Sequence, residues 1–249
     1  KLVNGFDIVA SGATELVLDF DALRSIVEKG KGTFSLKPTI KVLETVENSV
    51  GGIIDDGTDP VGGALVSAQI YTPPSDPVPA EWDPKDEVTV AGGTVSFNDP
   101  NLPDEYGTYL MFLPPNTYNI VATKEGFAPA CTQVEAEFYE AYTANVTLAV
   151  AEISGTFSGS VTGLATADDS AVFSIRQPHD PCGMIEVASV NVANTVDSDP
   201  VIYSVPIILP VGTYEVVVSS EGEITQVFDV VEVTDVGDAV LDVDFNPAP

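Results

Sequence analysis

The sequence predicts an all-β protein, in which two tandem antiparallel β-sandwiches follow a short strand-helix-strand segment. The first supporting observation is a duplication. Residues 109–126 read YLMFLPPNTYNIVATKEG, and residues 206–222, about 96 positions later, read PIILPVGTYEVVVSSEG. The triplet TQV follows both copies, beginning at Thr132 and at Thr225. A repeat of this length corresponds to a whole sandwich module, so the chain carries at least two copies of one small domain.

The second observation is the alternation of apolar and polar residues along the predicted strands. In the last strand Leu241, Val243 and Phe245 alternate with Asp242 and Asp244. Such a strand has one buried apolar face and one solvent-exposed polar face. Two antiparallel sheets that pack face to face bury this pattern, which favours sandwiches over open sheets.

Residues 1–48 are expected to be the C-terminal fragment of a β-rich domain. The stretch LVLDFDALRSIVEKGKG starts as a strand and then becomes helical, with Asp19 or Asp21 as N-cap and Gly30 as its end. The apolar face of this helix consists of Leu23, Ile26 and Val27. The stretch FSLKPTIKVLETV is a final strand, in which Pro38 indicates an edge position or a break. Because so short a segment cannot bury its own apolar face, we expect it to pack on its neighbour or on another chain.

Residues 49–150 are expected to form the first sandwich. Alternating apolar residues in 64–70 mark one of its strands, and Val146, Leu148 and Val150 are expected to point inward from the last strand. Residues 73–84 contain five prolines and the only tryptophan, which predicts an extended surface loop.

Residues 151–249 are expected to repeat this plan as the second sandwich. Tyr214, Val216 and Val218 are predicted to face its core, whereas Glu215 and Ser219 are predicted to face water. No apolar run approaches the roughly 20 residues that a membrane helix requires, so the sequence predicts no membrane span.

The net charge of −29 is distributed unevenly along the chain. Residues 1–48 hold seven acids and six bases, residues 49–150 fifteen and two, and residues 151–249 sixteen and one. Acidity of this degree repels nucleic-acid phosphates and anionic lipid surfaces, which excludes nucleic acid as a partner. The near-neutral N-terminal end can instead meet an acidic module.

The two cysteines, Cys131 and Cys182, lie 51 positions apart in different repeats and do not form a CxxC motif. Two interpretations remain open: a disulfide that links the two modules covalently, or two unpaired thiols. The only histidine, His179, precedes Asp180 and Cys182 and offers a nominal metal site. Zinc usually takes four ligands at recognisable spacing, so a polar loop is favoured and no cofactor is predicted.

Acidic turns are candidate calcium ligands, because calcium binds carboxylate and carbonyl oxygens. They comprise Asp55, Asp56 and Asp59, the pair Asp168 and Asp169, and the pair Asp197 and Asp199. None has the spacing of an EF-hand loop, so solvated turn residues are the favoured interpretation.

The N-terminal stretch resembles the end of an extracytoplasmic family, domain of unknown function 4382. The residues that carry the likeness are Leu18 to Ala22, Arg24 and Ser25, Leu36 to Pro38, Ile40 and Val42. The likeness covers about the first 45 residues. It implies that most of that domain lies upstream, and the start at Lys1 rather than at methionine is expected of a processed product or fragment.

The two repeats resemble carboxypeptidase regulatory-like domains. The likeness rests on the stretch Pro60-Val61-Gly62-Gly63-Ala64-Leu65-Val66 and on the motif L-P-x-x-T-Y, with a following Glu-Gly, that begins at Leu113 and at Leu209. The second copy lacks the early signature. This resemblance implies transthyretin-like or Ig-like sandwiches of the kind found in bacterial surface proteins.

Aromatic residues offer a candidate binding surface. Trp82 in the proline-rich loop, together with Phe138, Tyr139 and Tyr142, is expected to form a platform for a sugar ring or a partner chain, or else to cover a small core. A carbohydrate-binding module is therefore an alternative function.

The function favoured by the sequence is that of a non-enzymatic structural or interaction protein, secreted or at the surface of a prokaryotic cell. A His-dependent catalytic triad would have to use the single histidine. No spacing of Asp or Glu residues singles out a catalytic carboxylate pair of the glycosidase type. The expected partner is another copy or another surface protein, which would assemble into a filament or coat by head-to-tail or strand-complementation contacts. The basic residues predicted to make this contact are Lys29, Lys31 and Lys37.

Overall fold

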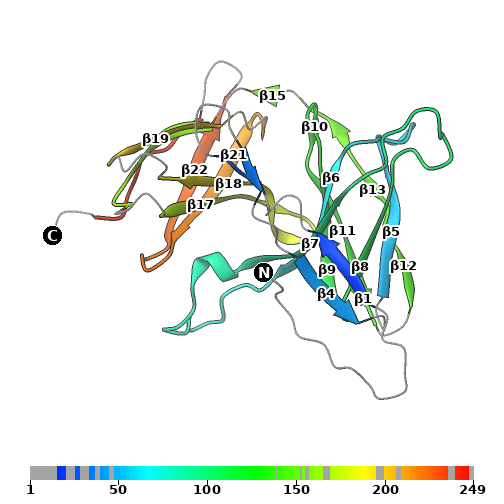
Figure 1. Cartoon of the computed structure of the whole chain (residues 1–249), viewed down its shortest axis with the longest axis horizontal. Coiled ribbons are helices and arrows are strands. Elements are labelled where there is room, and N and C mark those ends of the chain that lie inside the picture. The colour runs from blue at the N-terminus through cyan, green and yellow to red at the C-terminus, as the bar shows by residue number, and fades with distance from the viewer. Residues whose placement is uncertain are drawn as a thin grey trace.

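The structure is a computed structural model, drawn in Figure 1. It describes residues 16–20, 26–28, 34–36, 40–44, 48–137, 140–151, 153–154, 157–164, 169–194, 199–205, 209–234 and 239–246. Within these ranges the regular structure is β, apart from the 3-10 turn η1 (Pro84–Asp86). No helix among them is long and apolar enough to cross a membrane. The predicted all-β fold is confirmed.

Four strands lie in the N-terminal segment: β1 (Leu16–Phe20), β2 (Ile26–Glu28), β3 (Phe34–Leu36) and β4 (Ile40–Glu44). β1 pairs with β4, and β2 pairs with β3, both antiparallel. The predicted helix is therefore wrong at Ile26 and Val27, which lie in a strand. Both residues are β-branched, and a short apolar run that contains such residues suits a strand as well as a helix. Leu23 and Gly30 lie outside the described residues.

The first sandwich has two sheets. One sheet has the order β11 (Ala130–Ala136), β9 (Asn116–Thr123), β6 (Leu65–Tyr71) and β7 (Val88–Val95). In the other sheet β5 (Asn48–Asp55) is central, between β8 (Thr108–Leu113) on one side and β12 (Ala141–Thr143) and β13 (Val146–Thr147) on the other. A short ladder joins β10 (Phe127–Ala128) to β14 (Ala149–Val150).

The second sandwich repeats this plan. Its first sheet has the order β18 (Gly183–Ala193), β17 (Ser170–His179), β21 (Gly212–Ser220) and β22 (Gln226–Val233). In its second sheet β16 (Phe157–Thr162) is central, between β19 (Val201–Val205) and the pair β23 (Ala239–Val240) and β24 (Val243–Asp244). A short ladder joins β15 (Ile153–Ser154) to β20 (Leu209–Pro210).

Both sandwiches close in the same way. β12 and β13 run parallel to β5, and β23 and β24 run parallel to β16, whereas the other pairings are antiparallel. A glycine in each central strand allows this closure. A Cβ atom on Gly52 would lie 2.4 Å from the carbonyl oxygen of Ala144, and one on Gly159 would lie 1.9 Å from that of Leu241. The closing segment therefore approaches the main chain more closely than any side chain would permit.

The repeated tyrosines occupy equivalent corners. The hydroxyl of Tyr118 donates to the carbonyl oxygen of Pro114, and that of Tyr214 donates to Pro210, both at 2.8 Å. The two side chains are 1% and 2% exposed. Burial raises the pKa of Tyr214 to about 12, so its hydroxyl stays a donor. The shared motif thus anchors a buried ring to the backbone four residues upstream.

Each sandwich has its own apolar core, and the last predicted strand of each tests the alternation rule. Leu241, Val243 and Phe245 are buried as expected. Val146 and Leu148 are also buried, but Val150 is exposed, which contradicts its predicted inward position. Val150 pairs with Phe127 in the short β10–β14 ladder, away from the parallel closure against β5.

We expect the two corner hydroxyls to contribute similarly to stability. Tyr118→Phe and Tyr214→Phe should each lower the free energy of unfolding by about 1–2 kcal/mol, because a proline carbonyl loses its donor. Urea denaturation measures this loss. Tyr106→Phe is the control, since Tyr106 is half-buried in the turn before β8 and does not belong to the repeated motif. A loss at one corner only would contradict the equivalence of the two sandwiches.

Candidate functional site

The second sandwich lies against the outer face of a sheet of the first, as Figure 1 shows. β18 contacts β6, β7 and β9 across this face, which we call the junction. Side chains that point away from the first core are consequently buried, with Asn119 3% and Val121 1% exposed. Val121 belongs to the apolar cluster of the second sandwich. The contact is therefore continuous with a core and is more than a tether between modules.

A disulfide joins the sandwiches at one end of the junction. Cys131 of β11 is bonded to Cys182, which precedes β18, and the Cα atoms are 6.6 Å apart. The Nδ1 atom of His179 lies 3.2 Å from the Cys131 sulfur. The donor atoms of these three residues lie within 4.8 Å of one another, but both sulfurs are already paired with each other. A metal at this place would require reduction of the disulfide.

Side-chain amides of the first sandwich pair with the main chain of β18 and of Cys182 just before it. The Nε2 group of Gln69 donates to the carbonyl oxygen of Glu186 at 2.7 Å, and the N–H of Glu186 donates to Gln69 Oε1 at 2.8 Å. Nearby, Asn119 Nδ2 donates to the carbonyl oxygen of Cys182 at 2.7 Å. Gln69 thus presents the donor and acceptor that a neighbouring strand would present, and it satisfies a buried strand edge.

Gly183 allows β18 to begin close to the first sandwich. Its φ of +72° is in the region that favours glycine. A Cβ atom at this position would lie 2.3 Å from the ring of Tyr71. The residue after Cys182 must therefore lack a side chain for β18 to pack beside β6.

A segment of the first sandwich reaches over to the second. We call residues 72–87 the arm; it includes the proline-rich stretch and η1, and η1 contacts β21. Residues 72–81 are exposed, as expected of a surface loop, but the carbonyl oxygens of Pro84 and Lys85 accept hydrogen bonds from Arg176. The loop prediction therefore holds for the first part of the arm and is wrong for its end.

Arg176 of β17 is the central cation of the junction, and its side chain is 1% exposed. Nη1 donates to the carbonyl oxygen of Pro84 at 2.9 Å, and Nη2 donates to that of Lys85 at 3.2 Å. Nε donates to the hydroxyl of Ser174, which donates to Glu186 Oε2 at 2.5 Å. A planar guanidinium has the several donors in fixed directions that this arrangement needs.

Two carboxylates lie beside this guanidinium. Nη1 of Arg176 is 3.6 Å from Glu87 Oε2 and 3.9 Å from Glu215 Oε1. Burial raises the pKa of Glu87, and Arg176 offsets part of this rise. Burial and the neighbouring Glu87 raise the pKa of Glu215, again against the effect of Arg176. Glu215 therefore faces the junction, which corrects its predicted position in water.

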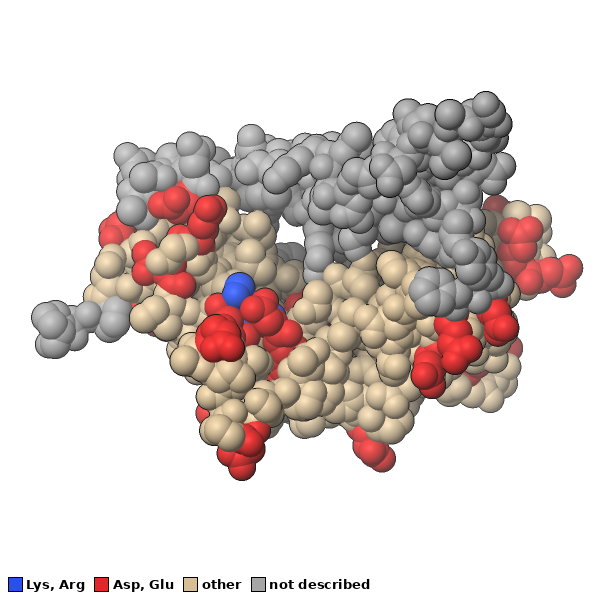
Figure 2. All heavy atoms as spheres, turned by 90° about the horizontal axis from the view of Figure 1, so that it is seen from below, with Lys and Arg blue, Asp and Glu red and all other residues tan. Residues whose placement is uncertain are grey.

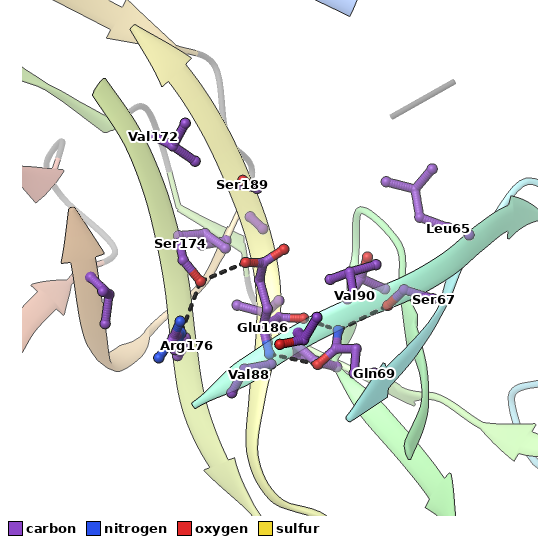
Figure 3. A pocket seen from close by; sticks show the side chains of 18 of the residues that line it. Leu65, Ser67, Gln69, Val88, Val90, Val172, Ser174, Arg176, Glu186 and Ser189 are labelled. Atoms are coloured by element: carbon purple, nitrogen blue, oxygen red, sulfur yellow. Dashed lines mark hydrogen bonds between the residues drawn. The ribbon is translucent and has the colours of Figure 1, made fainter. Parts of the chain in front are cut away.

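A cleft of about 990 Å³ runs along the junction between the two sandwiches. Figure 3 shows Glu186 in this cleft, with Ser174 and Arg176 on one side and Gln69 on the other. Two apolar residues of the cleft lining, Leu65 and Val172, are 41% and 39% exposed. Hydrogen bonds thus bridge the cleft at Glu186, whereas Leu65 and Val172 stay accessible to solvent.

The described surface is strongly acidic. In Figure 2 acidic side chains are scattered over the face in view, and basic side chains are scarce. From residue 48 onward the sequence contains three bases, Lys85, Lys124 and Arg176, and the last of these is buried. Lys124 donates to the carbonyl oxygen of Gly62. Most basic residues therefore belong to the N-terminal segment.

The predicted aromatic platform is not assembled by the residues that the structure describes. Trp82 is half-buried in the arm, two residues before η1. Tyr142 is half-buried on β12, in the sheet that does not face the junction, and its hydroxyl accepts a hydrogen bond from the N–H of Glu137 at 2.8 Å. Phe138 and Tyr139 lie outside the described residues, as do Lys29, Lys31 and Lys37.

The acidic turns use their carboxylates locally. Asp56 Oδ1 accepts from the N–H groups of Thr58 and Asp59, and these hydrogen bonds lower the pKa of Asp56. Asp55 caps the same turn through the N–H of Gly57. Asp199 accepts from the N–H of Gly163, whereas Asp168 and Asp197 lie outside the described residues. Turn capping accounts for these carboxylates without calcium.

Of the junction residues, the sequence indicated only Cys131 and Cys182, whose disulfide was one of the two interpretations left open, and it missed the polar residues. Arg176 is the only base in residues 151–249, and Gln69 interrupts a run of apolar and small residues. Both are unusual in their context, because a lone cation or amide in an apolar strand is commonly buried with partners. The partners come from distant parts of the chain, so the sequence alone did not reveal them.

Comparison with known proteins finds similarity at the level of structure. No protein-family model matches the sequence, and no curated protein matches it. The structure is similar to the Bacillus anthracis TIE protein, with 13% identity, a TM-score of 0.28, and coverage of 86% of this chain and 37% of that one. It is similar to a streptococcal ancillary pilin, with 14% identity, a TM-score of 0.28, and coverage of 90% and 74%.

A third similar structure is the shaft pilin SpaA from Lactobacillus rhamnosus GG. The identity is 12%, the TM-score is 0.28, and the match covers 80% of this chain and 98% of the pilin. The chain spans little more than a third of the length of the TIE protein. Because the identities and TM-scores are this low, these similarities carry no argument about function, and both family resemblances stay predictions.

Loss of the Arg176 cation should destabilise the junction. Arg176→Met should lower the free energy of unfolding by about 3–5 kcal/mol, because Glu87, Glu215 and two main-chain carbonyls lose a buried partner. Urea denaturation followed by the fluorescence of Trp82, the only tryptophan, measures the effect. Lys85→Met is the matched control, since Lys85 pairs with Asp83 and Asp86 at the surface and should contribute about 1 kcal/mol or less. Equal losses would contradict the central role of Arg176.

Acidification should stabilise the junction down to the ordinary pKa of a glutamate. The folded-state pKa values of Glu87 and Glu215 are raised above 4.5, so folding takes up protons between pH 4.5 and the raised values. Their stabilising contribution is full below pH 4.5 and is lost as the pH rises through the folded-state pKa values. Urea denaturation at a series of pH values should therefore show a weaker pH dependence for Glu215→Gln than for the wild type. Glu223→Gln, at an exposed position, should leave the dependence unchanged; an unchanged profile for Glu215→Gln would refute the idea.

Proposed function

We propose that the chain is a non-enzymatic structural protein of a prokaryotic cell surface, in which two sandwiches are held as one rigid unit and copies assemble into a filament or coat. The observation that carries this proposal is the junction. A disulfide, side-chain amides on the β18 edge and a buried guanidinium all join the same two modules. A protein that transmits load or displays a surface needs such rigidity, because flexibly linked modules move independently by default.

The disulfide supports a location outside the cytoplasm. Disulfides persist in oxidising compartments and are rare in the reducing cytoplasm. The acidity of residues 49–249 supports the same proposal, since net charge of one sign keeps such modules soluble and apart. Assembly then requires a segment that is not strongly acidic, and the N-terminal segment, with seven acids and six bases, is near-neutral.

The surroundings of the only histidine support a non-enzymatic role. His179 lies against the Cys131 sulfur, which is already oxidised in the disulfide with Cys182. A histidine-dependent nucleophile would have to use this imidazole. The buried carboxylates of the junction, Glu87 and Glu215, are engaged with Arg176 and serve to join the modules.

Deletion of residues 1–47 tests the proposal; Asn48 is kept because it is buried at the start of β5. We expect the purified full chain to form particles larger than a monomer in electron micrographs and in sedimentation, and the deleted chain to remain monomeric. Circular dichroism and an intact disulfide in the deleted chain provide the control for folding. Assembly that survives the deletion, or a full chain that stays monomeric under all conditions, would refute the proposal.

A further inference from the structure

The disulfide end of the junction brings three metal-binding side chains together. The sulfurs of Cys131 and Cys182 and a ring nitrogen of His179 all lie within 4.8 Å of one another. Thiolate sulfur and imidazole nitrogen are ligands that suit zinc. Because the two sulfurs are bonded to each other in this structure, the set becomes available to a metal only in a chain whose cysteines are thiols.

The positions of the two cysteines do not depend on the S–S bond alone. Cys131 lies opposite Val121 in the ladder between β11 and β9. The carbonyl oxygen of Cys182 accepts a hydrogen bond of 2.7 Å from Asn119 Nδ2, and Asn119 also belongs to β9. Reduction breaks the S–S bond and leaves these main-chain hydrogen bonds intact. One strand of the first sandwich therefore keeps both cysteines in place.

The histidine is fixed by the turn that carries Cys182. His179 ends β17 and lies opposite Gly183, the first residue of β18, in their ladder. Gly183 packs so closely on Tyr71 that a Cβ atom would lie 2.3 Å from that ring. Among the described residues the imidazole has one hydrogen-bonding neighbour, the Cys131 sulfur, 3.2 Å from Nδ1. Nδ1 is therefore directed at the sulfurs and has no competing partner in this part of the chain.

Charge and access also suit a divalent ion. Cys182 is 1% exposed, whereas Cys131 and His179 are half-buried, so the set is accessible from one side. Metals bind cysteine as the thiolate. Two thiolates and a neutral imidazole around a divalent cation carry no net charge, which a largely buried position tolerates better than a bare ion. The strongly acidic modules on either side raise the local concentration of cations.

We propose that Cys131, Cys182 and His179 form a zinc site in the thiol form of the chain, and that the ion then joins the two sandwiches in place of the disulfide. A newly synthesised chain carries its cysteines as thiols, so it needs no reductant to reach this state. Binding forms two zinc–sulfur bonds and one zinc–nitrogen bond and releases the two thiol protons. Water completes the tetrahedron, since no carboxylate of the described residues belongs to the cluster. The inference goes beyond the proposed function and does not depend on it.

Cobalt substitution in the full chain tests the site. A phosphine reduces the disulfide, becomes the phosphine oxide with an oxygen from water, and is removed before Co²⁺ is added without air. We expect the intense visible absorption of tetrahedral Co²⁺ and a thiolate-to-cobalt charge-transfer band, both saturating at one ion per chain and abolished by Zn²⁺. The oxidised chain is the control and should show neither band.

Ligand variants give a second measurement. Competition with a chromophoric chelator should show that His179→Ala weakens zinc binding by about a hundredfold, and Cys131→Ser should abolish the charge-transfer band. The matched control is Asp180→Asn, which removes an exposed carboxylate beside the histidine and outside the cluster. Its affinity for zinc should be unchanged. Equal losses in Asp180→Asn and His179→Ala would overturn the ligand set.

Thermal unfolding tests whether the ion joins the modules. Zinc should raise the unfolding midpoint of the reduced chain relative to a chelator, and it should not raise that of reduced Cys131→Ser. A reduced chain that folds and shows no tetrahedral cobalt spectrum would overturn the site. A spectrum that persists in urea would show that the folded arrangement is not needed, and a reduced chain that does not fold with zinc would show that β9 does not hold the ligands; either result would also overturn it. Assembly of the oxidised chain is unaffected by any of these outcomes, so the proposed function is tested separately.

Discussion

The arrangement of the two sandwiches depends on satisfying the main chain of a buried strand edge. β18 is the edge strand of its sheet, and it lies against the outer face of the first sandwich. A buried N–H or C=O group without a partner costs about 1–3 kcal/mol, so an apolar face alone would not hold an edge strand there. Gln69 and Asn119 provide the missing partners and convert a face of the first sandwich into a surface that recognises one strand.

Charge has a second role at this contact. The guanidinium of Arg176 binds main-chain carbonyls of the arm and lies beside carboxylates from two separate elements. A buried cation is costly unless it is paired and fully hydrogen-bonded, and the arm supplies this environment. The arm is therefore part of the junction, and the proline-rich stretch before it is the exposed route to that position.

The duplication explains why the two sandwiches are so alike inside and so different outside. The corner tyrosines, the central glycines and the parallel closing strands recur in both copies, since each copy has to solve the same packing problem. The outer faces are not constrained in this way. Asn119 and Val121 on the first copy are covered by the second copy, and the equivalent residues of the second copy, Glu215 and Val217, are half-buried and buried, respectively, at the same junction. The outer faces of both copies therefore contribute to the contact, with different side chains.

Local pattern determined the sandwich fold. Alternation, turn residues and the repeated Tyr motif predicted the strands and the equivalence of Tyr118 with Tyr214, because these depend on neighbours in sequence. Alternation also predicted the inward side chains of Leu241, Val243 and Phe245. The prediction of a helix at Ile26 and Val27 was wrong, because a short run with β-branched residues is compatible with a helix or a strand. Apart from the disulfide of Cys131 and Cys182, which the sequence left open, the junction was decided by tertiary structure. Gln69 meets Glu186, and Arg176 meets Pro84, across separations of 117 and 92 positions, and no local rule says which outer face a second module will cover.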